Sequence, residues 1–157
     1  MPQFAANLTM LFNEYPFMER FEKAAKSGFQ AVEFLFPYAY SAHEIRQQLD
    51  QNNLRLVLHN LPPGDWDAGE RGIACLPDRV EEFRAGVTKA IEYATTLGVN
   101  QLNCLAGKTP EGIDPDLLRK TFIANLKYAA AELKKANIKL LIEPINTFDI
   151  PGFYLTK

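Results

Sequence analysis

Five short, largely apolar runs alternate along this sequence with longer segments whose apolar residues recur at helical spacing. The apolar runs lie at residues 3–8, 31–36, 54–59, 101–105 and 138–143. Helices are expected over about residues 16–27, from residue 41, over 79–97 and from 114 to about 136. Parallel strands that are covered on both faces have this kind of apolar sequence. The alternation predicts an α/β fold, either the opening of a (β/α)8 barrel or a doubly wound open sheet.

The expected helices carry sequence signals at their ends. Ser41 and Glu44 have the spacing of a capping box, in which each side chain accepts a hydrogen bond from the other residue's backbone. Asp114 followed by Pro115 is a typical N-cap and first-turn pair. Gly98 directly follows the helix expected over residues 79–97, and glycine at this position is typical of a helix end. These local signals predict where the helices begin and stop.

The 157 residues are enough for one domain, and neither a linker nor a low-complexity segment divides them. A closed (β/α)8 barrel typically needs about 250 residues. We therefore expect a single, partial barrel domain over residues 1–157, truncated after its fifth strand, with about five strands and four helices. The last strand would then have an open edge, through which the chain could form a homo-oligomer.

The charge balance and the cysteines limit the classes of partner and compartment. Lys and Arg number 17 against 19 Asp and Glu, and no basic run is present, so nucleic acid is not an expected partner. No apolar run approaches the roughly 20 residues that span a bilayer, so no membrane partner is expected. Since no basic residue precedes Arg20 and Cys75 and Cys104 lie far apart, we expect a cytoplasmic protein with reduced thiols.

Glu143 is the residue in this sequence with the strongest prediction of a catalytic role. It follows the apolar run Leu140-Leu141-Ile142, and Pro144 behind it cannot extend a strand ladder. In parallel α/β proteins the functional side chains gather at the carboxyl ends of the strands. Glu143 is therefore predicted to be an acid–base group, the alternative being a solvated carboxylate or a salt bridge to a nearby loop.

Three other residues at the same ends are candidates for substrate binding. His59 could act as acid, base or donor to substrate, or be a hydrogen-bonded core histidine. Lys108 follows a glycine but lacks the earlier glycine of a phosphate loop; it could pair with a substrate carboxylate or be a solvated lysine. Trp66, the only tryptophan, lies in the long segment 60–78, which predicts either a lid or a loop packed on the barrel rim.

The chemistry of the available ligands favours a hard metal ion over zinc. Only two histidines are present and the cysteines form no cluster, so a multi-zinc site is not expected. Carboxylate and carbonyl oxygens suit Mg²⁺ or Mn²⁺, with Glu143 as the predicted ligand.

Two long motifs, around residues 59–75 and 141–152, make a specific resemblance visible. They read HNLP at 59–62, GDW at 64–66, AGERGIAC at 68–75, LIEPIN at 141–146 and FDIPG at 148–152. With these motifs the sequence resembles, over essentially its whole length, the hydroxypyruvate isomerase family of the xylose isomerase-like TIM barrel superfamily.

The resemblance implies a reversible conversion of hydroxypyruvate, a small 2-oxo acid, into 2-hydroxy-3-oxopropanoate (tartronate semialdehyde) through an enediol. It implies no organic cofactor, a divalent metal as in related barrels, and two glutamates as acid and base. Glu143 matches the first glutamate, whereas the second has no counterpart in this sequence, so the 157-residue chain alone is expected to be inactive. The alternatives are an isomerase of 2-oxotetronate or a related sugar acid, and a non-catalytic product that associates through its open sheet edge.

Overall fold

The computed structural model describes residues 2–157, in which five strands alternate with four α-helices. The strands are β1 (Ala5–Asn7), β2 (Ala31–Glu33), β3 (Arg55–Asn60), β4 (Gln101–Cys104) and β5 (Lys139–Ile142). The helices are α1 (Arg20–Lys26), α2 (Ala42–Gln51), α3 (Val80–Leu97) and α4 (Pro115–Lys135). Short 3₁₀ helices, η1 (Phe17–Glu19) and η2 (Pro77–Arg79), lead into α1 and α3. In this part of the chain no helix combines the length and apolarity needed to cross a membrane.

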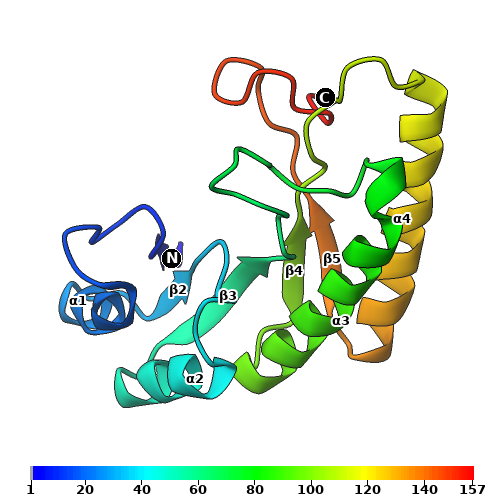
Figure 1. The fold of residues 1–157 in the computed structure, drawn as a ribbon. Helices are drawn as coiled ribbons and strands as arrows, with labels where there is room; N and C mark the ends of the chain where they lie inside the picture. Colours follow the sequence, from blue (N-terminus) through cyan, green and yellow to red (C-terminus); the bar gives the residue numbers. More distant parts are fainter. Residues whose placement is uncertain (1) are drawn as a thin grey trace.

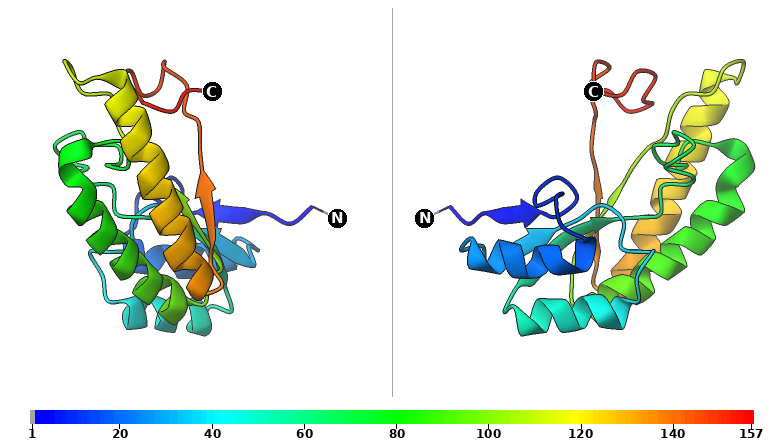
Figure 2. Two further views of the ribbon diagram at one scale, coloured as in Figure 1. Left: turned by 90° about the vertical axis from the view of Figure 1, so that its right-hand side faces the viewer. Right: turned by 60° about the vertical axis from the view of Figure 1, so that its left-hand side comes forward.

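All five strands are parallel and lie side by side in the order in which they occur in the chain. The helices cover the convex side of this curved sheet, and the loops that follow the strands gather beyond their carboxyl ends (Figures 1 and 2). A doubly wound sheet would instead reverse its strand order and carry helices on both faces. The arrangement is therefore that of a (β/α) barrel, and the predicted fold class, with five strands and four helices, is confirmed.

The helix ends follow the local sequence signals. The capping box of Ser41 and Glu44 is formed at the start of α2. The Asp114 side chain accepts a hydrogen bond of 3.0 Å from the Asp116 backbone N–H, with Pro115 in the first turn of α4. Gly98 ends α3 with a left-handed φ of 73°, a conformation that costs glycine little.

Four of the strands are shorter than the apolar runs suggest, most clearly β1 and β2, whereas β3 keeps the predicted length and is shifted by one residue. The run 31–36 predicted a strand of that length, but regular pairing ends at Glu33. The register with β3 shifts between Val32 and Glu33, and beyond this irregularity the hydrogen bonds Phe34 N–H to Leu58 O and Asn60 N–H to Leu35 O continue without forming a regular strand. β5 likewise ends at Ile142, so that Glu143 is the first residue beyond the strand.

The hydrophobic core lies between the sheet and its helices. Its largest fully buried apolar side chains come from both layers: Leu8, Phe21, Val32, Phe34, Ile45, Leu49, Val87, Leu97, Leu102, Leu118 and Leu133. On α3 the apolar residues at helical spacing are buried at Phe83, Val87, Ala90 and Ala94, while Ile91 is only partly buried. Full burial of one such large side chain contributes about 1.5–3 kcal/mol. This packing fixes the convex layer and leaves the carboxyl ends of the strands to polar groups.

Candidate active site at the carboxyl ends of the strands

A cavity of about 410 Å³ lies where β2, β3, β4 and β5 end. Leu35, Leu105 and Pro144 supply apolar parts of its wall, each from the segment just after a strand. Its polar and aromatic lining includes Asn60, Trp66, Arg71, Glu143, Asn146 and Asp149. One predicted catalytic residue, Glu143, and one predicted substrate-binding residue, Trp66, therefore share this cavity.

Glu143 lies directly beyond β5, with its side chain exposed toward the cavity that it lines. The amide nitrogen Nδ2 of Asn103 donates a hydrogen bond of 3.3 Å to Glu143 Oε2. Asn103 is itself buried on β4, in register with Leu141 of β5, so the donor is held by the sheet. A hydrogen bond from a donor held in the sheet fixes the orientation of the carboxylate.

Two buried polar atoms beside Glu143 have no partner within the described residues, Asn103 Oδ1 and Asn60 Nδ2. The two asparagines are paired in register across β3 and β4. Buried polar groups are costly when they are left without a hydrogen bond, so the unpaired amide of Asn60, which lines the cavity, marks a place where a ligand or water is accommodated. The neighbourhood of Glu143 is therefore prepared for polar contacts.

A second polar pair lies at the same edge of the sheet, on β1 and β2. Asn7 Nδ2 donates a hydrogen bond of 3.1 Å to Glu33 Oε1, and the two residues are in register. Neither residue lines the cavity.

His59 lies in a different environment, between the sheet and the helices. Its ring is fully buried and stacks on Phe34 with centroids 6.3 Å apart, and Nδ1 is 3.1 Å from the carbonyl oxygen of Asn60. Burial lowers its pKa to about 4, so the imidazole is neutral near pH 7. The structure does not bring His59 to the cavity with Glu143, and its role in substrate binding stays a prediction.

Lys108 also lies outside this cavity. Its side chain is exposed, its backbone forms an antiparallel bridge with Phe153, and its carbonyl oxygen lies 3.7 Å from the Cys75 thiol. Burial raises the pKa of Cys75 to about 11 and that of Cys104 to about 12, so both thiols stay protonated. The pairing of Lys108 with a substrate carboxylate stays a prediction.

The loop that carries Trp66 is tightly folded over the rim of the sheet. The indole ring packs on Phe36 with centroids 4.9 Å apart, and the Arg71 guanidinium lies 3.9 Å from the centre of the indole. The Glu70 carboxylate accepts hydrogen bonds from the Asp65 backbone and, at 2.7 Å, from Arg79. The loop therefore packs on the rim, as one of the two predictions for it stated.

Arg71 is a cavity residue that the sequence patterns did not single out as a candidate. It is one charged side chain in a loop that also holds Asp65, Asp67 and Glu70, so nothing local distinguishes it. Its only sequence signals are its place inside the specific motif 68–75 and its distance of five residues from the sole tryptophan.

The described side chains offer few ligands for the Mg²⁺ or Mn²⁺ ion that the sequence predicts. Within residues 2–157, no group of three or more His, Cys, Asp or Glu side chains is placed to hold a metal ion. Glu143 offers one carboxylate, which by itself does not make a site for Mg²⁺ or Mn²⁺. Its role as a metal ligand stays a prediction.

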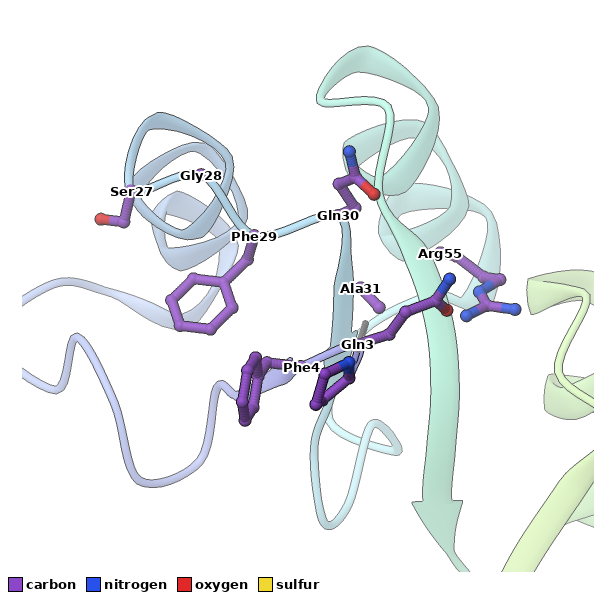
Figure 3. A pocket seen from close by; sticks show the side chains of 9 residues that line it. Gln3, Phe4, Ser27, Gly28, Phe29, Gln30, Ala31 and Arg55 are labelled. Atoms are coloured by element: carbon purple, nitrogen blue, oxygen red, sulfur yellow. The ribbon is translucent and has the colours of Figure 1, made fainter.

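A larger hollow of about 730 Å³ lies at the opposite, amino-terminal ends of the strands. Figure 3 shows the side chains of Phe4, Phe29 and Arg55 around it, from the segments before β1 and β2 and from the start of β3. No carboxylate within residues 2–157 lines it. It therefore lacks the acid–base group that the cavity at the carboxyl ends has.

Comparison with known proteins gives consistent matches. The family described as xylose isomerase-like TIM barrel matches residues 21–156. The hydroxypyruvate isomerase of Escherichia coli K12 is 59% identical over 156 residues, which are 99% of this chain and 60% of that protein. A 2-oxo-tetronate isomerase of Cupriavidus necator is 48% identical over 157 residues, which are 100% of this chain and 60% of that protein.

A solved structure matches equally well along the chain. The crystal structure described as AP endonuclease, family 2, from Brucella melitensis superimposes with a TM-score of 0.95 at 50% sequence identity. The match covers 99% of this chain and 60% of that one. The chain thus spans about 60% of the length of each of these relatives.

Proposed function

This chain belongs to the xylose isomerase-like TIM barrel family, and on that premise we propose that it carries the acid–base carboxylate of an isomerase that interconverts hydroxypyruvate and 2-hydroxy-3-oxopropanoate. The observation that carries the proposal is Glu143, which lines a cavity at the carboxyl ends of the strands and is oriented by Asn103. The 59% identity to the E. coli hydroxypyruvate isomerase supports the choice of substrate.

The reaction moves one proton between neighbouring carbons. Glu143 removes a proton from the hydroxymethyl carbon of hydroxypyruvate, and the electron pair of that C–H bond forms the carbon–carbon double bond of an enediol. The π pair of the keto group moves to the keto oxygen, which takes up a proton and becomes the second hydroxyl of the enediol. The enediol then collapses: the hydroxyl on the old hydroxymethyl carbon loses its proton to solvent and becomes the aldehyde oxygen, and the electron pair of the double bond takes a proton from the Glu143 carboxyl at the former keto carbon. The proton released to solvent balances the one that the keto oxygen took up. The sum is an isomerisation without net oxidation. A positioned carboxylate is suited to such a transfer.

The buried amides beside Glu143 support this chemistry. Asn103 holds the carboxylate from one side by its Nδ2 group. Asn60, which lines the cavity and has a free Nδ2 within the described residues, can donate to a substrate oxygen on which charge develops. A donor fixed in a strand loses little freedom on binding, so its contribution is available in the transition state.

The proposal extends to the setting of the enzyme. The substrate is a small 2-oxo acid, the compartment is the cytoplasm, and no organic cofactor takes part. The proposal also includes Mg²⁺ or Mn²⁺ as a cofactor, with Glu143 as one of its ligands. Because the described residues hold no set of three ligands, none of the steps above depends on the metal.

A second substrate is favoured by one observation, the 48% identity to a 2-oxo-tetronate isomerase. That substrate is also a 2-oxo acid with a hydroxyl group on the neighbouring carbon, so the same proton transfer applies. The ratio of kcat/KM for hydroxypyruvate and 2-oxotetronate discriminates between the two assignments. A ratio above one supports hydroxypyruvate, and a ratio below one supports the alternative.

The catalytic assignment is tested by Glu143→Gln. The substitution keeps the shape of the side chain and removes the base, so we expect kcat to fall by about 10²- to 10⁴-fold with the fold retained by circular dichroism. The assay uses the chain itself and a chimera in which residues 1–157 replace the matching part of the E. coli enzyme. The control is Glu81→Gln on α3, whose side chain is 85% exposed and pairs with Arg84.

Glu81→Gln should keep normal turnover in the chain itself or in the chimera, whichever of the two is active. Near-normal turnover in Glu143→Gln would contradict the role of Glu143. Absence of isomerisation of either 2-oxo acid in both forms would contradict the proposed function as a whole.

A further inference from the structure

Arg71 is held at the cavity by one terminal nitrogen and by one face of its guanidinium group. Nη1 donates hydrogen bonds of 3.0 Å to the Trp66 carbonyl oxygen and of 2.6 Å to the Glu70 carbonyl oxygen. The face of the group lies on the indole ring at 3.9 Å. A cation stacked on tryptophan in this way is stabilised and loses much of its rotational freedom.

The rest of the guanidinium group has no partner in the described part of the chain. Arg71 forms no salt bridge there, although Arg20, Arg46 and Arg79 all bind oxygen groups with Nε as well as with their terminal nitrogens. Nε and Nη2 of Arg71 remain free within residues 2–157. An arginine that lines a cavity with one edge held and donors still unused is prepared for an anionic ligand.

The backbone beside Arg71 holds it in place. Gly72 has φ of +103°, and a Cβ atom there would lie 2.3 Å from the carbonyl oxygen of Leu105, just beyond β4. The Gly72 N–H also donates a hydrogen bond of 2.9 Å to the Pro63 carbonyl oxygen. The loop is thus closed on itself and pressed against the end of a strand, which places Arg71 at the same cavity as Glu143.

We propose that Arg71, supported by the indole ring of Trp66, binds the carboxylate of the substrate and selects 2-oxo acids over neutral ketoses. The proposal rests on the proposed function, because it assigns the substrate class of that same cavity. Guanidinium and carboxylate groups match in shape and form paired, charge-assisted hydrogen bonds. The keto and hydroxymethyl carbons of the acid then remain free for Glu143. Trp66, a predicted substrate-binding residue, acts in this proposal through Arg71.

The test measures binding and does not depend on turnover. Trp66 is the only tryptophan of the chain, so its fluorescence reports on events at Arg71. The 157-residue chain is titrated with hydroxypyruvate and with dihydroxyacetone, its neutral analogue in which a hydroxymethyl group replaces the carboxylate. Isothermal titration calorimetry repeats both titrations without the optical probe.

We expect Arg71→Gln to raise the Kd for hydroxypyruvate by tenfold or more, since a hydrogen bond to a charged group is lost. The Kd for dihydroxyacetone should change by less than about twofold. Arg71→Lys keeps the charge and loses the paired donors, so its Kd for hydroxypyruvate should lie between those of the wild type and Arg71→Gln. The matched control is Arg84→Gln, because Arg84 also lies over an aromatic ring, Tyr128 at 5.1 Å, but does not line the cavity.

The outcomes separate this proposal from the proposed function. An unchanged Kd for hydroxypyruvate in Arg71→Gln, or an equal loss for both ligands, would overturn the carboxylate role. Failure of the wild-type chain to bind hydroxypyruvate would overturn it as well. If Arg71→Gln weakens the binding of hydroxypyruvate but not of dihydroxyacetone, and the protein shows no isomerisation, the carboxylate site is supported. Only the proposed isomerase activity is then contradicted.

Discussion

His59 and Asn60 are neighbours in β3 whose side chains lie in different environments, because successive side chains of a strand point to opposite faces. His59 is buried against Phe34 and Tyr38 in the core. Asn60 lines the cavity with Glu143. The candidate catalytic and binding residues therefore lie on the cavity side of the sheet. The neutral His59 packs in the core on the opposite side.

The buried histidine predicts an acid-sensitive stability. Its pKa is about 4 in the folded protein, against 6.5 for an unperturbed histidine. As the pH falls below 6.5, the unfolded chain takes up a proton that the folded chain does not. The free energy of unfolding should therefore decrease between about pH 6.5 and 4, by up to about 3 kcal/mol from this group.

Urea unfolding of wild type and His59→Gln across this pH range measures the effect. Carboxylates titrate in both proteins, so the difference between the two curves isolates the histidine. The variant should have the flatter curve. Two parallel curves would contradict the prediction.

At the scale of elements, the loop between β3 and η2 is held by contacts that a side chain on Gly72 would break. A methyl group at Gly72 collides with the Leu105 carbonyl oxygen, whereas at Gly69, with φ of +93°, nothing lies within 4 Å. Both residues have left-handed φ, so Ala at either position has the backbone cost of about 1–2 kcal/mol. The steric conflict is added only at Gly72.

We therefore expect Gly72→Ala to lower the free energy of unfolding by more than Gly69→Ala does, by roughly 1–3 kcal/mol. It should also weaken hydroxypyruvate binding, because it displaces Arg71. Thermal unfolding and the fluorescence titration measure the two effects. Equal behaviour of the two variants would show that the Leu105 contact does not position the loop.

The elements also show which structural features can be predicted from sequence. Helix ends at Ser41, Gly98 and Asp114 depend on residues within one turn, so local patterns predicted them. The position of Glu143 at the carboxyl end of β5 followed from the apolar run before it and the proline behind it, although the strand was predicted to include Glu143 and ends one residue earlier. The register shift of β2 depends on pairing with β3, and the place of Arg71 depends on closure of a loop against β4. Such long-range contacts leave no periodic pattern in the sequence.

At the scale of the whole molecule, we expect the edge of the sheet formed by β5 to pair with other chains. β5 pairs with β4 and with no other strand of residues 2–157, and Ile142 on it is 47% exposed. Exposed apolar edges favour pairing with other chains. The chain should therefore elute from size-exclusion chromatography as larger species when its concentration is raised.

Ile142→Lys should shift this equilibrium toward the monomer, because a charge on an edge strand opposes pairing. Ile123→Lys on α4 is the matched control, since Ile123 has a similar exposure of 41% but lies on a helix. A chain that stays monomeric at every concentration would contradict edge-driven association.

The sequential strand order has a consequence for how the chain acquires its structure during synthesis. Within residues 2–157, each of the strands β2 to β5 pairs with the strand that is made just before it. Each new strand and helix can dock on a surface that already exists, which keeps the closed loops short and the entropic cost of each step low. Assembly can proceed from the amino terminus, and the groups around Glu143 come together when β5 reaches the sheet.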